Sequence, residues 1–280
     1  MAELADKIRV AVRARPFSRR EVDLGAAGVV EMAGGRTLLH PPSSTPSENK
    51  KPPKSFMYDY CFNSVDPADP SFAGQENVFD CVGQDILQNA FKGYNACILA
   101  YGQTGSGKSY TMMGSQAEQG IIPRLCNNLF ERITAAESSG ESQTKVEVSY
   151  MEIYNEKVFD LLDLTATTKQ GLKVREHSVL GPYVDGLSQL AVISYQEIED
   201  LMVEGNKGRT VAATNMNSES SRSHAVFTVV LTFTLTDART GVQGEKVGPV
   251  NSCLVEPGFL LIDNFYSRQK EVNIRMAPHS

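Results

Sequence analysis

The sequence contains no cysteine or histidine pattern typical of a metal site or a disulfide framework. Its four histidines are dispersed, and no two of its five cysteines form a Cys-x-x-Cys pair; these are Cys61, Cys81, Cys97, Cys126 and Cys253. Structural zinc sites and disulfide-stapled domains need closely spaced groups of these residues. The spacing therefore argues against both classes and favours a reducing compartment such as the cytosol.

Long apolar segments and an excess of positive charge are also missing. No stretch approaches the roughly 20 consecutive apolar residues that a membrane-spanning helix needs, and the formal net charge is -6. Without a general basic field, non-specific binding to nucleic acid or to anionic membranes is disfavoured, although a local basic patch remains compatible. We therefore expect no nucleic-acid partner and no membrane insertion.

Periodic apolar residues indicate a layered α/β domain. The apolar fraction of 41% in 280 residues is enough for a sizeable core. Alternation predicts strands at 7–15, 96–101, 145–154 and 225–236, and three- or four-residue spacing predicts helices at 75–91 and 124–136. The segment 40–54 is rich in Pro, Ser and Lys, which predicts an exposed loop. Strands interspersed with helices indicate an α/β fold, and we find no internal repeat.

The stretch NACILAYGQTGSGKSYTMMG, residues 95–114, is an apolar strand followed by a glycine-rich turn. It matches the pattern G-x-x-x-x-G-K-[ST], whose glycines let successive backbone N–H groups turn toward an anion. A lysine can neutralise the β- and γ-phosphates, and a serine hydroxyl suits Mg²⁺. A plain surface turn would leave Lys108 without a role. The pattern predicts a nucleoside triphosphate site formed by Gly102, Gln103, Thr104, Gly105, Ser106, Gly107, Lys108 and Ser109.

Four motifs together resemble the kinesin motor family. They are VAVRARPF at 10–17, AYGQTGSGKSYTMMG at 100–114, VSYMEIYNEKVFDLLD at 148–163 and NSESSRSHAVF at 217–227. The resemblance covers residues 6–247, and residues 174–217 look most like the third kinesin family, the vesicle and organelle transporters. It implies a three-layer P-loop NTPase fold with a central mixed sheet flanked by helices, incomplete at the C-terminus. It also implies ATP and Mg²⁺ as cofactors, microtubules as partner, and a place on the cytoskeleton in the cytoplasm.

The resemblance also assigns roles to individual residues. Arg13, Arg15 and Pro16 would line the adenine, and Tyr110 would stack on it, since an aromatic ring and a guanidinium both suit a purine face.

A second group of roles falls on the serine-rich motif. Asn217, Ser220 and Ser221 would close on the γ-phosphate, and Ser221 would join Ser109 in holding the magnesium ion. Ser220, Ser221 and Arg222 are the candidate catalytic residues, and Arg222 would pair with a glutamate further along the chain.

Each of these residues also has a plainer interpretation. Taken alone, Arg13 is most simply a solvated charge on a strand, and His224 a capping or packed histidine. A serine cluster usually forms a polar loop that bonds its own backbone. The lysines of the 40–54 segment are best interpreted as solvated, although contact with an acidic filament is also compatible with their charge.

The resemblance stops after GEKV at 244–247, where the family continues with a strand ending in D-L-A-G-S-E. Residues 248–280 form a divergent tail, so we divide the chain into a motor part, 6–247, and this tail. Glu256 and Asp263 are the alternatives for the aspartate that contacts the magnesium water shell. Neither is followed by the γ-phosphate-sensing glycine or the glutamate that would pair with Arg222, so hydrolysis should be much slower than in the family.

The family sequence that would follow residue 247 should also matter for the fold. In the family it supplies helices and a further strand, so we expect a gap in the sheet with exposed pairing edges. Pro249 and Pro257 should make a regular central strand from the tail difficult.

Three functions follow in order of preference. The first is an ATP-dependent microtubule motor domain, here truncated and impaired in hydrolysis. The alternative is a non-motile, nucleotide-binding regulatory or interaction fragment. A metabolic phosphotransferase using the same loop is disfavoured, because it leaves the motif NSESSRSH unexplained.

Overall fold

The computed structural model describes residues 8–33, 35–41, 52–138, 143–163, 171–178, 181–215, 223–236 and 243–255. The chain forms two compact units, Met1–Val82 and Gly83–Ser280.

The first unit holds two small sheets. Strand β1 pairs in parallel with β5, and β2, β3 and β4 form an antiparallel three-stranded sheet. Their bounds are Ala11–Ala14 (β1), Val30–Ala33 (β2), Arg36–Leu39 (β3), Lys54–Met57 (β4) and Tyr60–Asn63 (β5). The strand predicted at 7–15 is therefore confirmed in a shorter form. The predicted loop at 40–54 runs between β3 and β4, and its residues 42–51 lie outside the described part.

A short helix in this unit, α1 (Arg19–Asp23), is fixed by its first turn. The Ser18 hydroxyl accepts a hydrogen bond from the Glu21 N–H (3.3 Å), and the Glu21 carboxylate accepts one from the Ser18 N–H (2.7 Å). This is a capping box, which satisfies two backbone donors at a helix start. Both Arg15 terminal nitrogens donate to the same carboxylate at 2.8 Å. The Arg15 bonds, followed by those from Ser18, lower the pKa of Glu21 from 4.5 to about 2.

The helix predicted at 75–91 is present, but it is not uniform. It comprises α2 (Gln75–Val78), a π-helical turn (Phe79–Gly83) and α3 (Gln84–Phe91). A π turn inserts one extra residue per turn and shifts the faces on either side of it. The apolar spacing that predicted the helix does not reveal this insertion.

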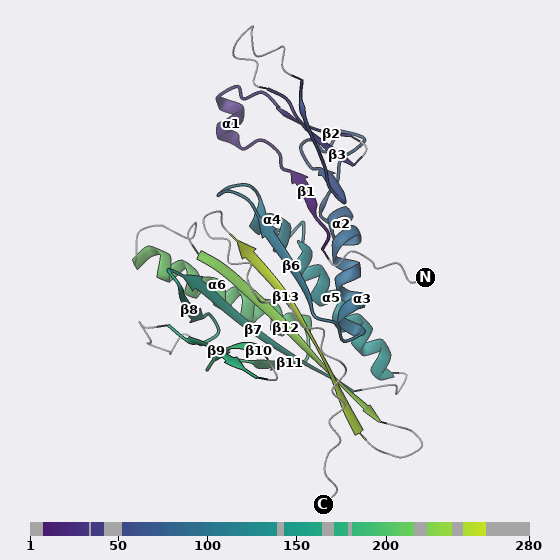
Figure 1. The fold of residues 1–280 in the computed structure, drawn as a ribbon, viewed down its shortest axis with the longest axis vertical. Coiled ribbons are helices and arrows are strands. Elements are labelled where there is room, and N and C mark those ends of the chain that lie inside the picture. The colour runs from purple at the N-terminus through teal and green to yellow at the C-terminus, as the bar shows by residue number, and fades with distance from the viewer. Residues whose placement is uncertain are drawn as a thin grey trace, which may run out of the picture. The chain divides into compact units, whose positions relative to one another are not determined.

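The second unit is built on a six-stranded mixed sheet (Figure 1). Strands follow one another in the order β11, β7, β12, β13, β6, and β8 pairs with β7. Only the contact between β13 and β6 is parallel. The bounds are Ala96–Tyr101 (β6), Gln143–Tyr154 (β7), Lys157–Asp160 (β8), Leu190–Val192 (β11), Ser223–Thr236 (β12) and Gln243–Val255 (β13). A separate hairpin pairs β9 (Lys173–His177) with β10 (Gly181–Asp185).

Alternation along β12 determines which face of this sheet is buried. Every second side chain is almost fully covered, while the Thr and Val side chains between them stay half-buried; the covered residues are Ala225, Phe227, Val229, Leu231 and Phe233. Helices α5 (Ile121–Ser138) and α6 (Tyr195–Asn215) run along this sheet (Figure 1). The Phe91 ring of α3 lies 5.6 Å from the Phe233 ring, so α3 packs on the same face. The mixed sheet with packed helices confirms the predicted fold class.

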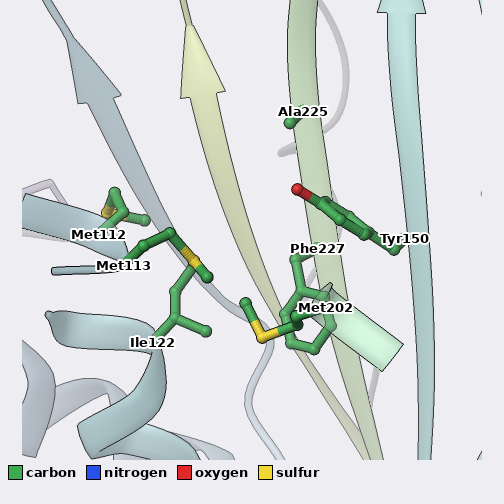
Figure 2. A pocket seen from close by; sticks show the side chains of 7 residues that line it. All are labelled: Met112, Met113, Ile122, Tyr150, Met202, Ala225 and Phe227. Carbon is green, nitrogen blue, oxygen red and sulfur yellow. The ribbon is translucent and has the colours of Figure 1, made fainter. Parts of the chain in front are cut away.

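Figure 2 shows where the two long helices and the sheet meet. The side chains are apolar apart from one hydroxyl, and they come from both helices, from the end of a short helix, α4 (Lys108–Met112), and from β7 and β12; they are Met112, Met113, Ile122, Tyr150, Met202, Ala225 and Phe227. The Tyr150 ring lies edge-on to Phe227 at 5.7 Å, and its hydroxyl donates to the Asn206 side chain at 2.9 Å. This region joins the helices to the sheet.

The structure of β13 differs from the prediction that prolines would disfavour a regular central strand. We expected Pro249 and Pro257 to make a regular central strand difficult, but the strand runs without interruption through Pro249 between β12 and β6. Pro257 lies outside the described residues. The reason lies in the register: Pro249 faces Val230 of β12, while pairing with β6 begins only at Val250. At Pro249 the strand has one neighbour, so the missing N–H breaks no bond to β6. Among the described strands, the order from β11 to β6 has no gap.

Glu21→Gln should remove a pH-dependent contribution to stability. Because its folded pKa lies below the unfolded value, this carboxylate stabilises the fold above about pH 4.5, and the contribution is lost as pH falls toward about 2. Urea unfolding of wild type and variant should differ most at pH 7 and converge only as the pH falls through about 2. The difference should be modest and shrink in high salt, because the pair is solvent-accessible. A difference that is constant with pH would contradict the assignment.

Gly205→Ala should destabilise the second unit although alanine is the better helix former. A methyl group at Gly205 would lie 2.5 and 2.9 Å from two atoms of the Tyr150 ring. Overpacking of this kind costs about 1–3 kcal/mol of stability. The higher helix propensity of alanine relative to glycine offsets at most ~1 kcal/mol of this cost. We expect a net loss of roughly 1–2 kcal/mol in denaturant unfolding.

Tyr150→Leu supplies the control for this substitution. With the ring gone, adding Gly205→Ala should cost little or become favourable, which a double-mutant cycle measures. An equal penalty in both backgrounds would show that the ring is not the cause.

Candidate phosphate-binding site

The glycine-rich turn follows the carboxyl end of β6, at the edge of the six-stranded sheet. Tyr101 ends the strand, and a short helix, α4 (Lys108–Met112), starts directly after the turn. Gly105 and Gly107 have φ angles of 76° and 95°, where side chains are strongly disfavoured. The strand and the two glycine conformations agree with the sequence prediction. A loop at 113–120, closed by a bridge between Gly114 and Gln119, separates this helix from α5.

The Lys108 ammonium group is folded back into the loop. The residue is only 8% exposed, and Nζ donates to the carbonyl oxygens of Gly102 (2.8 Å) and Gln103 (3.0 Å). A buried ammonium group must find acceptors, because leaving water unpaired is costly. The charge predicted to meet phosphate is therefore held at the centre of the loop by the loop's own backbone.

Ser106 bonds to one of these carbonyl groups through its backbone. Its N–H donates to the Gln103 carbonyl at 3.1 Å, but its hydroxyl oxygen is buried and has no hydrogen-bond partner in the described part of the chain. A methyl group at Gly102 would lie 2.5 Å from this oxygen. Close packing thus explains why residue 102 has no side chain.

The remaining loop residues face outward. Gln103, Thr104, Gly105, Ser109 and Tyr110 are exposed, and Tyr110 retains 44% of its accessible surface. The structure thus brings together all nine predicted residues from Gly102 to Tyr110, with the lysine inside and the serine and tyrosine outside.

Strand β13 ends beside the start of the loop. Val255 is paired in parallel with Tyr101, the residue before Gly102. The carboxyl ends of adjacent parallel strands form the usual ligand edge of an α/β sheet. Glu256 and Asp263, the two candidates for the magnesium-shell carboxylate, lie outside the described residues.

The three predicted adenine residues belong to the first unit. Arg13 is not a solvated charge: Nε donates to the Ser64 hydroxyl (2.8 Å) and Nη1 to the Gln75 side-chain carbonyl (2.7 Å). Arg15 is held by Glu21, and Pro16 is exposed beside it. Ser64 and Gln75 were missed from the sequence, because partners 51 and 62 residues away carry no local signal.

The serine-rich motif is only partly described. Asn217, Ser220, Ser221 and Arg222 lie outside the described residues, and His224 is the second residue of β12. In the described ranges no group of three or more His, Cys, Asp or Glu side chains could hold a metal ion. Among the described helices, none is both long and apolar enough to cross a membrane.

Comparison with known proteins identifies the family. The family model for the kinesin motor domain matches residues 13–253. Over 248 residues, 88% of this chain, the sequence is 62% identical to kinesin-like protein KIF13A of Mus musculus and 61% identical to human KIF13B. It is 51% identical over 247 residues to KIF1A of Rattus norvegicus. The chain spans 14% of the length of each of these relatives.

Solved structures agree with the sequence matches. A KIF14 structure with ADP in complex with a microtubule superposes with a TM-score of 0.79 at 44% identity, covering 89% of this chain and 69% of that one. A structure described as a fast kinesin gives a TM-score of 0.76 at 33% identity, covering 94% and 69%. The family match over most of the chain, the relatives above 60% identity and this shared fold show that the chain belongs to the kinesin motor-domain family, within its third subfamily.

Proposed function

We propose that this chain is the nucleotide-binding portion of a microtubule motor, and that its loop at 102–109 binds the phosphates of ATP. The observation that carries the proposal is the buried Lys108 ammonium at the centre of a loop whose glycines adopt anion-binding conformations. Microtubule-bound KIF14 structures with ADP and with AMP-PNP support the same assignment by similarity.

The loop residues fit a magnesium nucleotide. Lys108 can exchange its two backbone acceptors for phosphate oxygens, which form stronger, charge-assisted bonds. The Ser109 hydroxyl, which is exposed, and that of Ser221 would hold the metal ion together with phosphate oxygens and water. When bound, Mg²⁺ neutralises charge that develops on the phosphates.

The base would be held by stacking and planar contacts. The exposed Tyr110 ring would stack on the adenine, and the family resemblance adds Arg13, Arg15 and Pro16 to its lining. Both guanidinium groups are already bonded within their own unit, so they present fixed planar surfaces rather than mobile charges.

The serine-rich motif would contact the γ-phosphate of the bound nucleotide. Asn217, Ser220 and Ser221 would close on the phosphate, and a serine hydroxyl would orient the attacking water. Arg222 would pair with an acidic side chain and hold the segment in place. The partner is a microtubule, and the setting is the cytoskeleton of the cytoplasm.

Hydrolysis should be impaired. Residues 6–247 carry the motor sequence, whereas 248–280 diverge before the D-L-A-G-S-E motif and so lack its aspartate, glycine and glutamate. Aligning water and stabilising the developing charge must occur together, so losing these groups should cost orders of magnitude in rate. The same divergence favours a second candidate function, a non-motile fragment that binds nucleotide without turning it over.

Lys108→Ala should weaken nucleotide binding strongly. Removing two charge-assisted contacts to phosphate should weaken binding of a fluorescent ATP analogue with Mg²⁺ by about 100-fold or more. Lys92→Ala, which removes an exposed lysine elsewhere in the second unit, is the matched control and should bind as wild type does. Equal binding by wild type and Lys108→Ala would refute the proposed phosphate site.

Phosphate release with and without microtubules then tests turnover. We expect Lys108-dependent binding with little microtubule-stimulated release, in keeping with impaired hydrolysis. Strong stimulation would mean that residues 248–280 replace the missing motif and that the chain is a working ATPase. Binding with no stimulation and no co-sedimentation with microtubules would favour the non-motile fragment.

A further inference from the structure

We propose that the buried Gln75 amide, together with the Ser64 hydroxyl, positions the Arg13 guanidinium for the base of a bound nucleotide. The inference rests on the proposed function, which assigns Arg13 to the adenine lining. It adds two residues that lie outside every motif of the sequence analysis. Gln75 and Ser64 are positioning residues, since they act on the nucleotide through Arg13 and do not themselves touch it.

The Arg13 guanidinium is held by acceptors from two separate elements. Its Nε donates to the Ser64 hydroxyl at 2.8 Å, and its Nη1 donates to Gln75 Oε1 at 2.7 Å. Ser64 directly follows β5, and Gln75 is the first residue of α2. Because the guanidinium group is planar and rigid, bonds to two of its nitrogens fix the plane of the group as well as its position.

The Ser64 hydroxyl is itself fixed in place. It donates to the Ala73 carbonyl oxygen at 2.5 Å, and the Ser64 N–H donates to the Ala14 carbonyl oxygen at 3.0 Å. A hydroxyl has one proton, so with that proton directed at Ala73 the oxygen accepts from the arginine. The segment from Ala73 to Gln75 therefore holds Arg13 twice, once directly and once through Ser64.

Burial strengthens this hold on Arg13. Gln75 is 2% exposed and Ser64 is 3% exposed, whereas Arg13 is half-buried. Water has little access to the two acceptors and cannot readily replace them, while part of the arginine remains accessible. The pair of Arg15 with Glu21 is more open, since both of its side chains keep about a third of their accessible surface.

Holding Arg13 in advance should favour binding of the base. A free arginine side chain has many rotamers, and ordering such a side chain on binding weakens affinity. Gln75 and Ser64 order it on folding instead, so the loss no longer falls on the binding step. Only contacts with the base depend on this ordering, because the proposed phosphate contacts are made by the loop at 102–109.

Comparing ATP with tripolyphosphate isolates the contribution of the base. Gln75→Met keeps the length of the side chain but removes the acceptor oxygen. It should weaken binding of Mg²⁺-ATP by about three- to tenfold, the usual effect of having to order one long side chain. Binding of Mg²⁺-tripolyphosphate, which has no base, should not change. Gln75→Glu keeps an acceptor oxygen and should retain the wild-type ratio of the two affinities.

An unchanged ratio of ATP to tripolyphosphate affinity in Gln75→Met would overturn the proposal. Ser64→Ala takes its place if the methionine variant does not fold, and it should lower the ratio in the same direction. Gln84→Met is the matched control, because Gln84 Oε1 accepts from Arg132 Nη2 at 3.1 Å in the second unit. A lowered ratio in this control as well would attribute the effect to general destabilisation and would also overturn the proposal.

An Arg13→Ala background tests whether Gln75 acts through the arginine. With the guanidinium group gone, Gln75→Met should have no further effect on the ratio of affinities. The same loss in both backgrounds would show that Gln75 acts by another route. If Arg13→Ala alone leaves the ratio unchanged, Arg13 does not meet the base, and the inference fails while the phosphate site stands.

Chemical modification of the ligand-free protein measures the positioning itself. Phenylglyoxal reacts with accessible guanidinium groups, and mass spectrometry of peptides follows each arginine separately. Gln75→Met should speed modification of Arg13 and leave Arg15, which Glu21 holds, at the wild-type rate. Equal Arg13 rates in wild type and variant would show that Gln75 does not hold the group.

Failure of the proposed function would look different. Wild type would then bind neither ATP nor tripolyphosphate, and the inference would fall with the phosphate site. Failure of the inference alone would leave Lys108-dependent binding intact, with the same ratio of affinities in wild type and Gln75→Met.

Discussion

Strand β12 is the constraint on which the second unit depends, because it is paired along almost its whole length on both sides. Residues 223–234 pair with β7, and residues 225–236 pair with β13. Through β13 the ladder reaches β6, whose carboxyl end carries the phosphate loop. The buried face of β12 also supplies the surface on which the helices pack. One alternating segment thus fixes the core and, two strands away, the position of the loop.

The second constraint is electrostatic. A lysine that must meet phosphate has to sit inside the loop, yet a buried ammonium group without acceptors would be unstable. The loop resolves this by offering its own carbonyls to Lys108. For the proposed phosphate site, a ligand would compete with these carbonyls for Lys108, and the net affinity would be the difference between the two sets of bonds.

The parts that could be predicted from the sequence are those with a local signal. Alternation revealed β12 and β7, and the glycine pattern after an apolar run revealed the loop and the left-handed conformations of Gly105 and Gly107. The π turn at Phe79–Gly83 was not visible, because one extra residue disturbs the apolar spacing too little to be recognised. The prediction for Pro249 was wrong because the residue that begins the pairing with β6 depends on strand register. Nor does spacing reveal that Arg13 contacts Ser64 and Gln75, since these contacts depend on how the strands of its unit are paired.

The parallel pairing of β13 with β6 brings the end of β13 to the edge of the sheet where the candidate phosphate loop begins, because Val255 stands beside Tyr101. The groups proposed to bind the phosphates, 102–110, precede the proposed divergence at 248 by more than a hundred residues, whereas the groups needed for hydrolysis would follow it. The high identity to the KIF13 sequences comes from a segment of 248 residues that is dominated by this upstream part. Such similarity therefore supports nucleotide binding more strongly than it supports turnover, and the chemistry of the residues after β13 decides between a motor and a nucleotide-binding fragment.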